Sequence, residues 1–218
     1  MASNRGRGSR STGRDNPDVK LSKALSYILR HGAEKEGLVL HEGGFVFVDE
    51  ILQKKQFSKY TEENIRNIVD TNDKKRFALK TDDATGKLMV RANQGHTLEV
   101  EGLELQPISG SVEAPTVLHG TYLEAWQFIK EQGLCRMARN HIHFAPGEPG
   151  KDGVISGMRM SCQVIVYINI DKAIQDGYKF YRSANNVILC PGNENGFLPT
   201  KYFERVIQLR PRKELPFS

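Results

Sequence analysis

A loop-rich stretch near the middle of the 218-residue chain separates two halves with different patterns of apolar residues. Residues 91–115 include several residues that favour turns over regular structure: Gly95, Gly102, Pro107, Gly110 and Pro115. Before this stretch the apolar residues recur mainly with helical spacing, and after it they mainly form short runs typical of buried strands. The sequence therefore predicts two folded parts with a boundary in this stretch.

The first half begins with a clear helix signal. Residues 16–18 (Asn-Pro-Asp) combine an N-cap residue, a first-turn proline and an acid near the positive end of the helix dipole. One apolar face follows, formed by Leu21, Ala24, Leu25, Ile28 and Leu29. Arg30 and His31 fall in the last turn, and Gly32 is the expected stop. The two cations either complement the helix dipole or have a function, and the helix pattern alone does not decide.

The remainder of the first half predicts two further helices and a β-hairpin. Residues 45–48 are interpreted as a short strand, Asp49 as the cap of a short helix, and residues 61–71 as a second helix. Residues 76–79 and 88–90 are then two strands around a glycine-containing turn. Helices followed by a hairpin are typical of a winged-helix module, which commonly binds nucleic acid, although fold alone is not function. The basic run before the hairpin is also consistent with a solvated surface.

The second half predicts an α+β part with mostly antiparallel strands. Residues 116–118 are interpreted as a buried strand that ends in residues 119–121 (His-Gly-Thr), and residues 122–132 as a helix capped by Gly133. Asp171 is expected to cap a short helix. Further strands are expected at residues 163–170, 187–189 and 205–209. The glycine-rich fingerprints of Rossmann and P-loop nucleotide sites are absent from the sequence.

One strand of the second half carries an unusual polar face. Alternate side chains of a strand share a face, so Arg139, His141 and His143 are expected to point one way, and Ile142 and Phe144 toward a core. A guanidinium followed by two imidazoles, with no acid nearby, suits the binding of an anion. The alternative is a solvated edge strand whose histidines have no function.

Composition and charge are those of an ordinary globular protein, with 39% hydrophobic and 26% charged residues. No apolar run approaches the ~20 residues that span a bilayer, and the N-terminus lacks the apolar segment of a secretory signal. Residues 1–14 contain four arginines and no acid, so they hold most of the net charge of +5 and are expected to be disordered. The three cysteines lack CxxC spacing and are expected to be free thiols of a soluble intracellular protein, in the cytoplasm or the nucleus.

Five motifs, taken in order, resemble those of the RNA 2′-phosphotransferases, the enzymes that remove the splice-junction 2′-phosphate from tRNA. They are LSYILRHG and DKKRF in the first half, and LHGTYLEAW, GLCRMARNHIHFAPG and RSANNVILCPG in the second. Each motif alone is weak, but five in order over residues 19–210 make the resemblance specific. It implies an N-terminal winged-helix lobe followed by a C-terminal ADP-ribosyltransferase-like lobe, with the active site between them. The expected division is a tail at 1–16, an RNA-binding lobe at 17–108 and an NAD-binding lobe at 109–218.

The resemblance also assigns roles to residues of both lobes. The set that binds the substrate phosphate falls on Arg30, His31, Arg76 and Arg139. Lys74 and Lys75, beside the third of these, leave its register open. The NAD-binding positions are His119, Gly120, Thr121, His143, Ser183 and Val187. His141 is interpreted either as part of the site or as a core or supporting residue, and the His-x-His pair lacks the further ligands that a zinc site needs.

The third of the NAD motifs, residues 183–187, departs from the pattern of the transferases that ADP-ribosylate proteins. Most of those place a glutamate there, which holds the ribose and helps to activate a weak nucleophile, whereas this chain has Val187 and no carboxylate until Glu194. A phosphate monoester is largely a dianion at pH 7, so it needs cations that position it rather than a base that activates it. The implied reaction consumes NAD, requires no metal and yields RNA with a 2′-hydroxyl, nicotinamide and ADP-ribose 1″,2″-cyclic phosphate.

Two other functions are compatible with the sequence. ADP-ribosylation of terminal phosphates on nucleic acids uses the same residues, and only the products distinguish it from phosphate transfer. A winged-helix nucleic-acid-binding protein without catalysis is the third hypothesis, but it leaves the His-Gly-Thr motif without a purpose. The expected partners are RNA with an internal 2′-phosphate (tRNA) and NAD, with no membrane, and the protein is expected to be a monomer.

Overall fold

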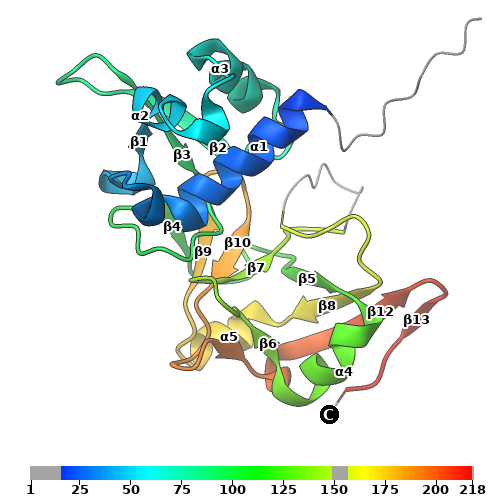
Figure 1. Ribbon diagram of the computed structural model, residues 1–218. Helices are drawn as coiled ribbons and strands as arrows, with labels where there is room; N and C mark the ends of the chain where they lie inside the picture. The colour runs from blue at the N-terminus through cyan, green and yellow to red at the C-terminus, as the bar shows by residue number, and fades with distance from the viewer. Residues whose placement is uncertain (1–15, 149–156, 218) are drawn as a thin grey trace, which may run out of the picture.

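The computed structural model describes residues 16–148 and 157–217. Two groups of elements meet near the middle of the molecule (Figure 1). We call them the N-terminal lobe (residues 16–92) and the C-terminal lobe (residues 105–217, as far as described). The predicted tail at residues 1–14 lies outside the described residues. In the described part of the chain, no helix has the length and apolar character needed to cross a bilayer.

The N-terminal lobe packs three helices against a small antiparallel sheet. The helices are α1 (Pro17–Tyr27), α2 (Val48–Leu52) and α3 (Glu62–Thr71). The strands are β1 (Val46–Phe47), β2 (Phe77–Thr81) and β3 (Leu88–Ala92), in the order β1-β3-β2. Leu25, Ile51 and Ile65, one from each helix, are fully buried in a common core. The predicted helices and the predicted hairpin of this half are confirmed.

Most of the helix starts follow from their sequence signals. Asn16 caps α1 through its side chain, and Thr61 caps α3 within a capping box. The prediction that Asp49 caps α2 is wrong, because that helix already begins at Val48. The Asp49 carboxylate instead forms an ion pair with Lys87 at 2.7 Å, which ties α2 to the hairpin.

The C-terminal lobe contains two four-stranded sheets, a two-stranded sheet and two helices. The helices are α4 (Leu123–Gln132) and α5 (Ile170–Gln175). The strands are β4 (Leu105–Ile108), β5 (Leu118–Thr121), β6 (Leu134–Cys135), β7 (Ile142–Phe144), β8 (Val164–Ile168), β9 (Phe180–Ser183), β10 (Ile188–Cys190), β11 (Phe197–Leu198), β12 (Phe203–Leu209) and β13 (Arg212–Glu214). The sheet orders are β4-β9-β10-β7, β13-β12-β8-β5 and β11-β6, and the described strand pairs are antiparallel. The predicted mixture of helices and mostly antiparallel strands is thus confirmed.

Three local predictions for this lobe are wrong. Strand β4 lies in the stretch that the sequence predicts as loop, and its Pro107 is tolerated because β4 is an edge strand. Strand β5 ends in residues 119–121 as expected, but it begins at Leu118 and not at residue 116. The cap of α5 is Asn169, whose side chain accepts a hydrogen bond at the helix start, and not Asp171.

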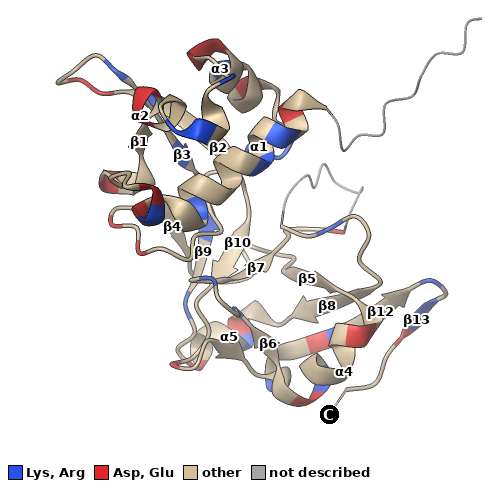
Figure 2. Cartoon of the chain, in the orientation of Figure 1, with Lys and Arg blue, Asp and Glu red and all other residues tan. Residues whose placement is uncertain are grey.

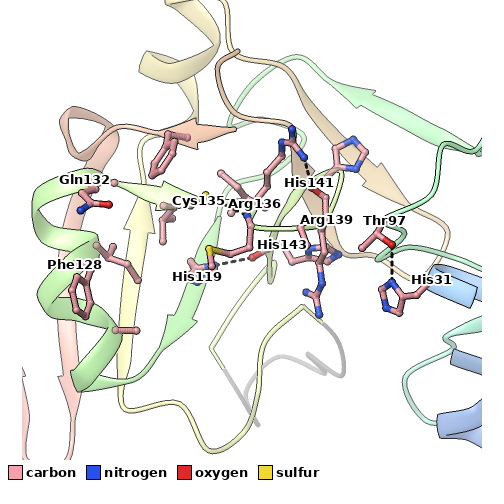
Figure 3. Close-up of a pocket in the computed structure, with 18 residues that line it drawn as sticks. His31, Thr97, His119, Phe128, Gln132, Cys135, Arg136, Arg139, His141 and His143 are labelled. Carbon is pink, nitrogen blue, oxygen red and sulfur yellow. Dashed lines mark hydrogen bonds between the residues drawn. The ribbon is translucent and has the colours of Figure 1, made fainter. Parts of the chain in front are cut away.

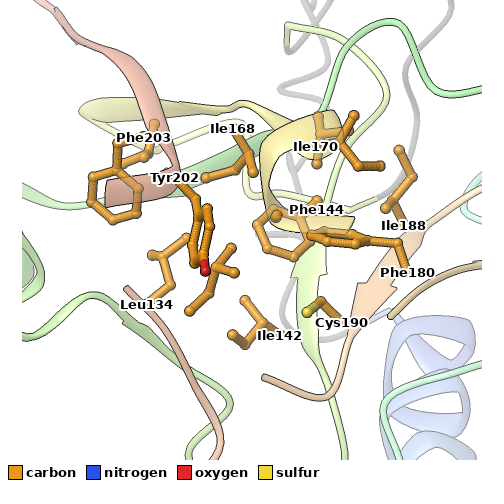
Figure 4. Packing of buried hydrophobic residues seen from close by; sticks show 14 of the residues in the cluster. Leu134, Ile142, Phe144, Ile168, Ile170, Phe180, Ile188, Cys190, Tyr202 and Phe203 are labelled. Atoms are coloured by element: carbon orange, nitrogen blue, oxygen red, sulfur yellow. The ribbon is translucent and has the colours of Figure 1, made fainter. Parts of the chain in front are cut away.

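The core of the C-terminal lobe gathers side chains from both four-stranded sheets (Figure 4). Ile142 and Phe144 of β7 are 2% and 0% exposed and face this core, as the strand alternation predicts. A bridge between Leu118 and Ala145 joins β5 to the end of β7, so the two sheets are linked at this point. The predicted polar face of β7 is thereby turned away from the core.

Hydrogen bonds to backbone carbonyls hold the two lobes against each other. The Asn185 side-chain amide donates to the carbonyl of Lys74 at 3.0 Å. Asn140 donates its side-chain amide to the carbonyl of Leu98 at 2.8 Å and its backbone amide to the carbonyl of His96 at 3.1 Å. The loop before β2 and the segment after β3 are therefore fixed by residues of the C-terminal lobe.

Gly133 is the residue whose replacement tests the packing of α4 against β11 most simply. It ends α4 with φ at 86°, and a Cβ there would overlap the carbonyl oxygen of Leu198. We predict that Gly133→Ala lowers the free energy of unfolding by at least ~2 kcal/mol, from backbone strain plus the overlap. Gly177→Ala is the control, since its φ is 93° but no atom lies within 4 Å. Equal losses for both variants in urea unfolding would contradict the role given to the close approach.

Candidate active site

A pocket of about 760 Å³ opens where the lobes meet. Helix α4, strand β6, the turn at residues 136–141 and strand β7 line it from the C-terminal lobe (Figure 3). His31 and Thr97 reach it from the opposite side. Four of the predicted site residues line this pocket together: His31, His119, Arg139 and His143.

Arg30 and His31 lie on a π-helical turn, Ile28–Gly32, that continues α1. The prediction of a regular helix as far as Gly32 is therefore wrong in detail, because α-helical geometry ends at Tyr27. Short π-helical turns are frequent at functional sites, since they re-aim the side chains that they carry. The turn is anchored by Ile28, which is fully buried, and it presents the two basic residues side by side at the lobe junction.

The protonation pattern of His31 is set by Thr97. The Thr97 hydroxyl donates to the carbonyl of Arg30 at 3.3 Å, so it can only accept from Nδ1 of His31, which lies 3.0 Å from Oγ1. The other ring nitrogen, Nε2, is then the one that can take up and release a proton. Burial, followed by the charges of Arg30 and Arg139, lowers the pKa of His31.

Three guanidinium groups from both lobes form a cation cluster: Arg30, Arg76 and Arg139. Burial, followed by the charges of the other two, lowers the pKa of Arg30 to about 10. Its buried Nε and Nη2 atoms have no hydrogen-bond partner among the described residues. Burial also lowers the pKa of Arg76 and of Arg139. Buried donors and like charges that face one another favour a multiply charged anion with several acceptor oxygens.

Arg139 does not lie on a strand as predicted, since β7 begins only at Ile142. It lies in the preceding turn, where its backbone amide donates to the carbonyl of Arg136 at 3.2 Å. The Arg136 guanidinium donates in return to the carbonyl of Arg139 at 2.7 Å. The turn thus holds Arg139 at the pocket while β7 continues the same wall with His143.

The loop before β2 selects Arg76 over its lysine neighbours. Asn72 accepts from the backbone amide of Arg76 at 3.1 Å and from its guanidinium at 3.5 Å, which orients this side chain. Arg76 is half-buried, and its charge acts on Arg30, whereas Lys75 is exposed. Lys74 is half-buried beside Arg76, and its pKa is lowered by burial and by that charge. The loop is therefore more than a solvated entry to the hairpin.

The two histidines assigned to NAD share one hydrogen-bonded arrangement. Nδ1 of His119 lies 3.0 Å from the carbonyl oxygen of His143 and donates to it, which leaves Nε2 of His119 as an acceptor. Nε2 of His143 lies 2.7 Å from the side-chain oxygen of Gln94 and donates to it. Burial, followed by the charge of Arg139, lowers the pKa of His143 to about 3, so this imidazole is neutral.

His141 lines the pocket and is half-buried, so the interpretation as a core residue is wrong, whereas a site role and a supporting role both fit its position. Its ring packs edge-on against Tyr181 with the centroids 6.2 Å apart. Burial and the charge of Arg136 lower its pKa.

The other predicted NAD positions do not line the 760 Å³ pocket. The Ser183 hydroxyl is engaged within its own turn, where it donates to the carbonyl of Val187 at 3.1 Å, and the Val187 side chain is fully buried. Thr121 is buried on β5. Gly120 lies so close to Met158 that a Cβ would come within 3.0 Å of its side chain. These residues shape the strands around the pocket.

The pocket is lined by basic and apolar side chains and by no acidic one. Its lining residues include no Asp or Glu, although Gln132 and Phe128 of α4 contribute an amide and an aromatic ring at one end. Within residues 16–148 and 157–217, no group of three or more His, Cys, Asp or Glu side chains is arranged to hold a metal ion. The cysteines Cys135, Cys162 and Cys190 are free thiols, as predicted.

Three residues that contribute to the site were not identified from the sequence: Gln94, His96 and Thr97. They lie in a segment whose glycines indicate a linker, and their polar pattern has no helical or strand periodicity. His96 is 3% exposed, and neither ring nitrogen has a hydrogen-bond partner among the described residues. Burial, followed by the charges of Arg30 and other nearby basic groups, lowers its pKa to about 4. His96 therefore adds no positive charge to the cation cluster.

This buried histidine gives a testable pH dependence. The folded-state pKa of about 4 lies below the ordinary value of 6.5, so between these pH values His96 is protonated in the unfolded chain and neutral in the folded one. Stability from this group is therefore lost as the pH falls from 6.5 toward 4. We predict that, as the pH falls from 7 to 4.5, the wild type loses about 2–3 kcal/mol more unfolding free energy than His96→Leu does. Urea unfolding at both pH values measures this difference, and the other titrating groups are common to both proteins. Parallel pH profiles would contradict a neutral, buried His96.

Known proteins match this sequence over most of its length. The model of the RNA 2′-phosphotransferase, Tpt1 / KptA family matches residues 16–192, which include residues of both lobes. The chain is 51% identical over 198 residues to tRNA 2′-phosphotransferase 1 of Bos taurus, covering 90% of this chain and 78% of that protein. It is 48% identical over 212 residues to tRNA 2′-phosphotransferase 1 of Danio rerio (95% and 94% covered) and 37% identical over 202 residues to tRNA 2′-phosphotransferase of Saccharomyces cerevisiae (89% and 85% covered). The chain therefore belongs to the RNA 2′-phosphotransferase (Tpt1 / KptA) family.

Proposed function

We propose that this protein transfers the splice-junction 2′-phosphate of tRNA to NAD, which yields RNA with a 2′-hydroxyl, nicotinamide and ADP-ribose 1″,2″-cyclic phosphate. The relatives that match nearly the whole chain are named tRNA 2′-phosphotransferases. The observation that carries the proposal is the cation cluster beside a pocket whose lining contains no carboxylate. Such a site holds a phosphate that is already nucleophilic, and it lacks the acid that activates a protein side chain.

In this proposal the substrate phosphate binds to Arg30, His31, Arg76 and Arg139. Arg30 supplies two buried donor atoms that have no partner among the described residues. The planar guanidinium suits two phosphate oxygens at once, and three of these groups offset the charge of the dianion. The bound phosphate also relieves the repulsion that lowers the pKa of Arg30.

NAD is the co-substrate and occupies the part of the pocket that the C-terminal lobe lines. His119 offers its free Nε2, and the neutral His143 continues the same wall without adding charge. Gly120, Thr121, Ser183 and Val187 act by setting the positions of the strands that carry these two histidines. The proposal divides the chain into a winged-helix lobe at 17–108, which binds RNA, and an ADP-ribosyltransferase-like lobe at 109–218, which binds NAD.

The first chemical step joins the two substrates. An oxygen of the RNA 2′-phosphate attacks the ribose carbon that carries nicotinamide, a C–O bond forms, and the C–N bond to nicotinamide breaks. The phosphate needs no deprotonation at pH 7, because its second pKa is near 6. Catalysis in this step is therefore mainly the orientation of two bound substrates.

The second step transfers the phosphoryl group. The oxygen of the ribose 2″-hydroxyl attacks phosphorus and its proton passes to solvent, the bond from phosphorus to the RNA 2′-oxygen breaks, and that oxygen takes up a proton. His31 is the proposed general acid, with the proton on Nε2, because Thr97 occupies Nδ1. The charges of Arg30 and Arg139 lower the pKa of His31 in the free protein, and a bound phosphate dianion offsets them, which favours the imidazolium that this step requires.

One reaction tests the proposed function. The protein is incubated with NAD and a short RNA bearing one internal 2′-phosphate, and both the RNA and the ADP-ribose products are analysed. We expect loss of the phosphate only when NAD is present, with equal formation of the cyclic phosphate product. Phosphate loss without NAD contradicts the proposal. ADP-ribose left attached to the RNA as the stable end product would instead favour the ADP-ribosylation of phosphates.

The two steps assign different consequences to different residues. We predict that His31→Ala and Arg76→Ala slow the second step by about 10²–10³-fold, as expected when one stabilising group of a transition state is removed. RNA carrying a phospho-ADP-ribose branch then accumulates and is resolved by gel or mass analysis. His119→Ala is the comparison variant, because damage to the NAD site slows formation of the branch itself. Activity lost in His31→Ala and Arg76→Ala with no branch at any time would show that both residues serve binding or the first step.

A further inference from the structure

A second pocket, of about 590 Å³, lies on the N-terminal lobe between the start of α1 and the end of α3. We call it the α1–α3 groove. Its lining includes the basic residues Lys23, Lys74 and Arg76, the acids Asp18 and Asp73, and several polar side chains. The basic residues of α1 are confined to the first two turns of the helix, where the groove begins (Figure 2). The groove is distinct from the 760 Å³ pocket, with which it shares no lining residue.

Arg76 connects this groove with the proposed phosphate site. Its side chain lines the groove, and its charge lowers the pKa of Arg30. Arg30 in turn acts on His31, which lines the 760 Å³ pocket. A phosphate held by the cation cluster therefore contacts Arg76, which also lines the groove.

The loop that forms this side of the groove is held in place from three directions. Asn72 binds the amide and the guanidinium of Arg76, and Asn93 donates to the carbonyl of Lys75 at 2.7 Å. Asn185 of the C-terminal lobe donates to the carbonyl of Lys74 at 3.0 Å. The groove is thus preorganised, and the segment at residues 183–187, which contains Asn185, fixes its position relative to the C-terminal lobe.

The mixture of charges in the groove fits a polynucleotide better than a free anion. Lys23 and Lys74 suit the phosphates of an RNA backbone, whereas Asp18 and Asp73 repel a small anion but accept hydrogen bonds from ribose hydroxyls. Asn72 lines the same groove with an amide, which can pair with a base edge or a 2′-hydroxyl. A nucleotide chain presents phosphates and hydroxyls together.

We infer that the α1–α3 groove binds the RNA chain on one side of the nucleotide that carries the 2′-phosphate. The inference rests on the proposed function, because an internal 2′-phosphate leaves the RNA to continue in both directions from the cation cluster. Arg76 belongs to both places, so the chain that leaves the phosphate site on its side enters the groove. Contact with a flanking nucleotide then distinguishes an internal phosphate from a terminal one.

The test uses the full chain with Lys23→Ala, and Lys35→Ala as the matched control. Lys23 is exposed on α1, where alanine favours the helix, so this variant is expected to fold. Lys35 is also exposed but lies beyond the opposite end of α1 and does not line the groove. Equilibrium binding is measured by fluorescence anisotropy for three RNAs with a 2′-phosphate: one extended on both sides, one only on the 5′ side and one only on the 3′ side.

We expect Lys23→Ala to weaken binding of the doubly extended RNA and of one singly extended RNA by roughly five- to tenfold. The slope of the logarithm of the binding constant against that of salt concentration should fall by ~0.7 for the lost phosphate contact. Binding of the other singly extended RNA and the KM for NAD should not change. Lys35→Ala should behave as the wild type with all three RNAs.

Two outcomes would overturn the inference: wild-type binding of all RNAs by Lys23→Ala, or equal weakening of all three. Equal effects of Lys35→Ala and Lys23→Ala would likewise show general charge attraction instead of a groove. The binding measurement does not require turnover. A wild-type protein that binds RNA through the groove but shows no NAD-dependent phosphate loss would contradict the proposed function and not the binding of RNA in the groove.

Discussion

The site depends on holding like charges together at a junction of two lobes. Two unit charges 4 Å apart in a partly buried setting repel by about 4 kcal/mol at an effective dielectric constant near 20. Arg76 and Arg139 repel the charge of Arg30 in this way, and their effect adds to that of burial in lowering its pKa to about 10. The lining of the 760 Å³ pocket supplies no carboxylate to relieve it. The charge that completes the site is therefore expected from the substrate.

Arginine is suited to this task because it remains charged under such a shift. At a pKa of about 10, Arg30 is still fully protonated at neutral pH. A lysine subject to the same downward shift would have a pKa of roughly 8 and would lose part of its charge. The surrounding histidines behave in the opposite way, because burial and the same cations lower the pKa of His143 to about 3 and that of His96 to about 4. The neutral imidazole of His143 thus makes a directed hydrogen bond to Gln94 without adding to the repulsion, and His96 adds no charge either.

The sequence predicts the elements better than it predicts how they meet. Capping residues and the helical spacing of apolar residues indicate α1 and α3, and a run of mostly β-branched residues indicates β8, because these signals are local. Strand β4 was not predicted, since its pairing with β9 is non-local and its Pro107 argues against a strand. The π-helical turn that carries Arg30 also has no local signal in the sequence.

The candidate site divides in the same way. The resemblance to a family indicates His31, His119, Arg139 and His143, and the structure brings these four residues to one pocket. Thr97 and Gln94, which fix the hydrogen bonds of two of these histidines, lie in a segment that looks like a linker. Their contribution is visible only in the folded structure, where this segment meets His31 of the N-terminal lobe and His143 of the C-terminal lobe. Sequence reasoning therefore finds side chains with distinctive chemistry and misses the ordinary ones that orient them.

The most direct measurement of the central claim compares two RNAs that differ only in the 2′-phosphate. Titration calorimetry gives the ratio of their affinities for the wild type and for Arg30→Gln, in which a neutral amide replaces the guanidinium. The account predicts that the wild type prefers the 2′-phosphorylated RNA by roughly tenfold or more. It also predicts that Arg30→Gln loses most of this preference while binding the 2′-hydroxyl RNA as the wild type does. An unchanged preference in Arg30→Gln, or no preference in the wild type, would contradict a phosphate site built from these cations.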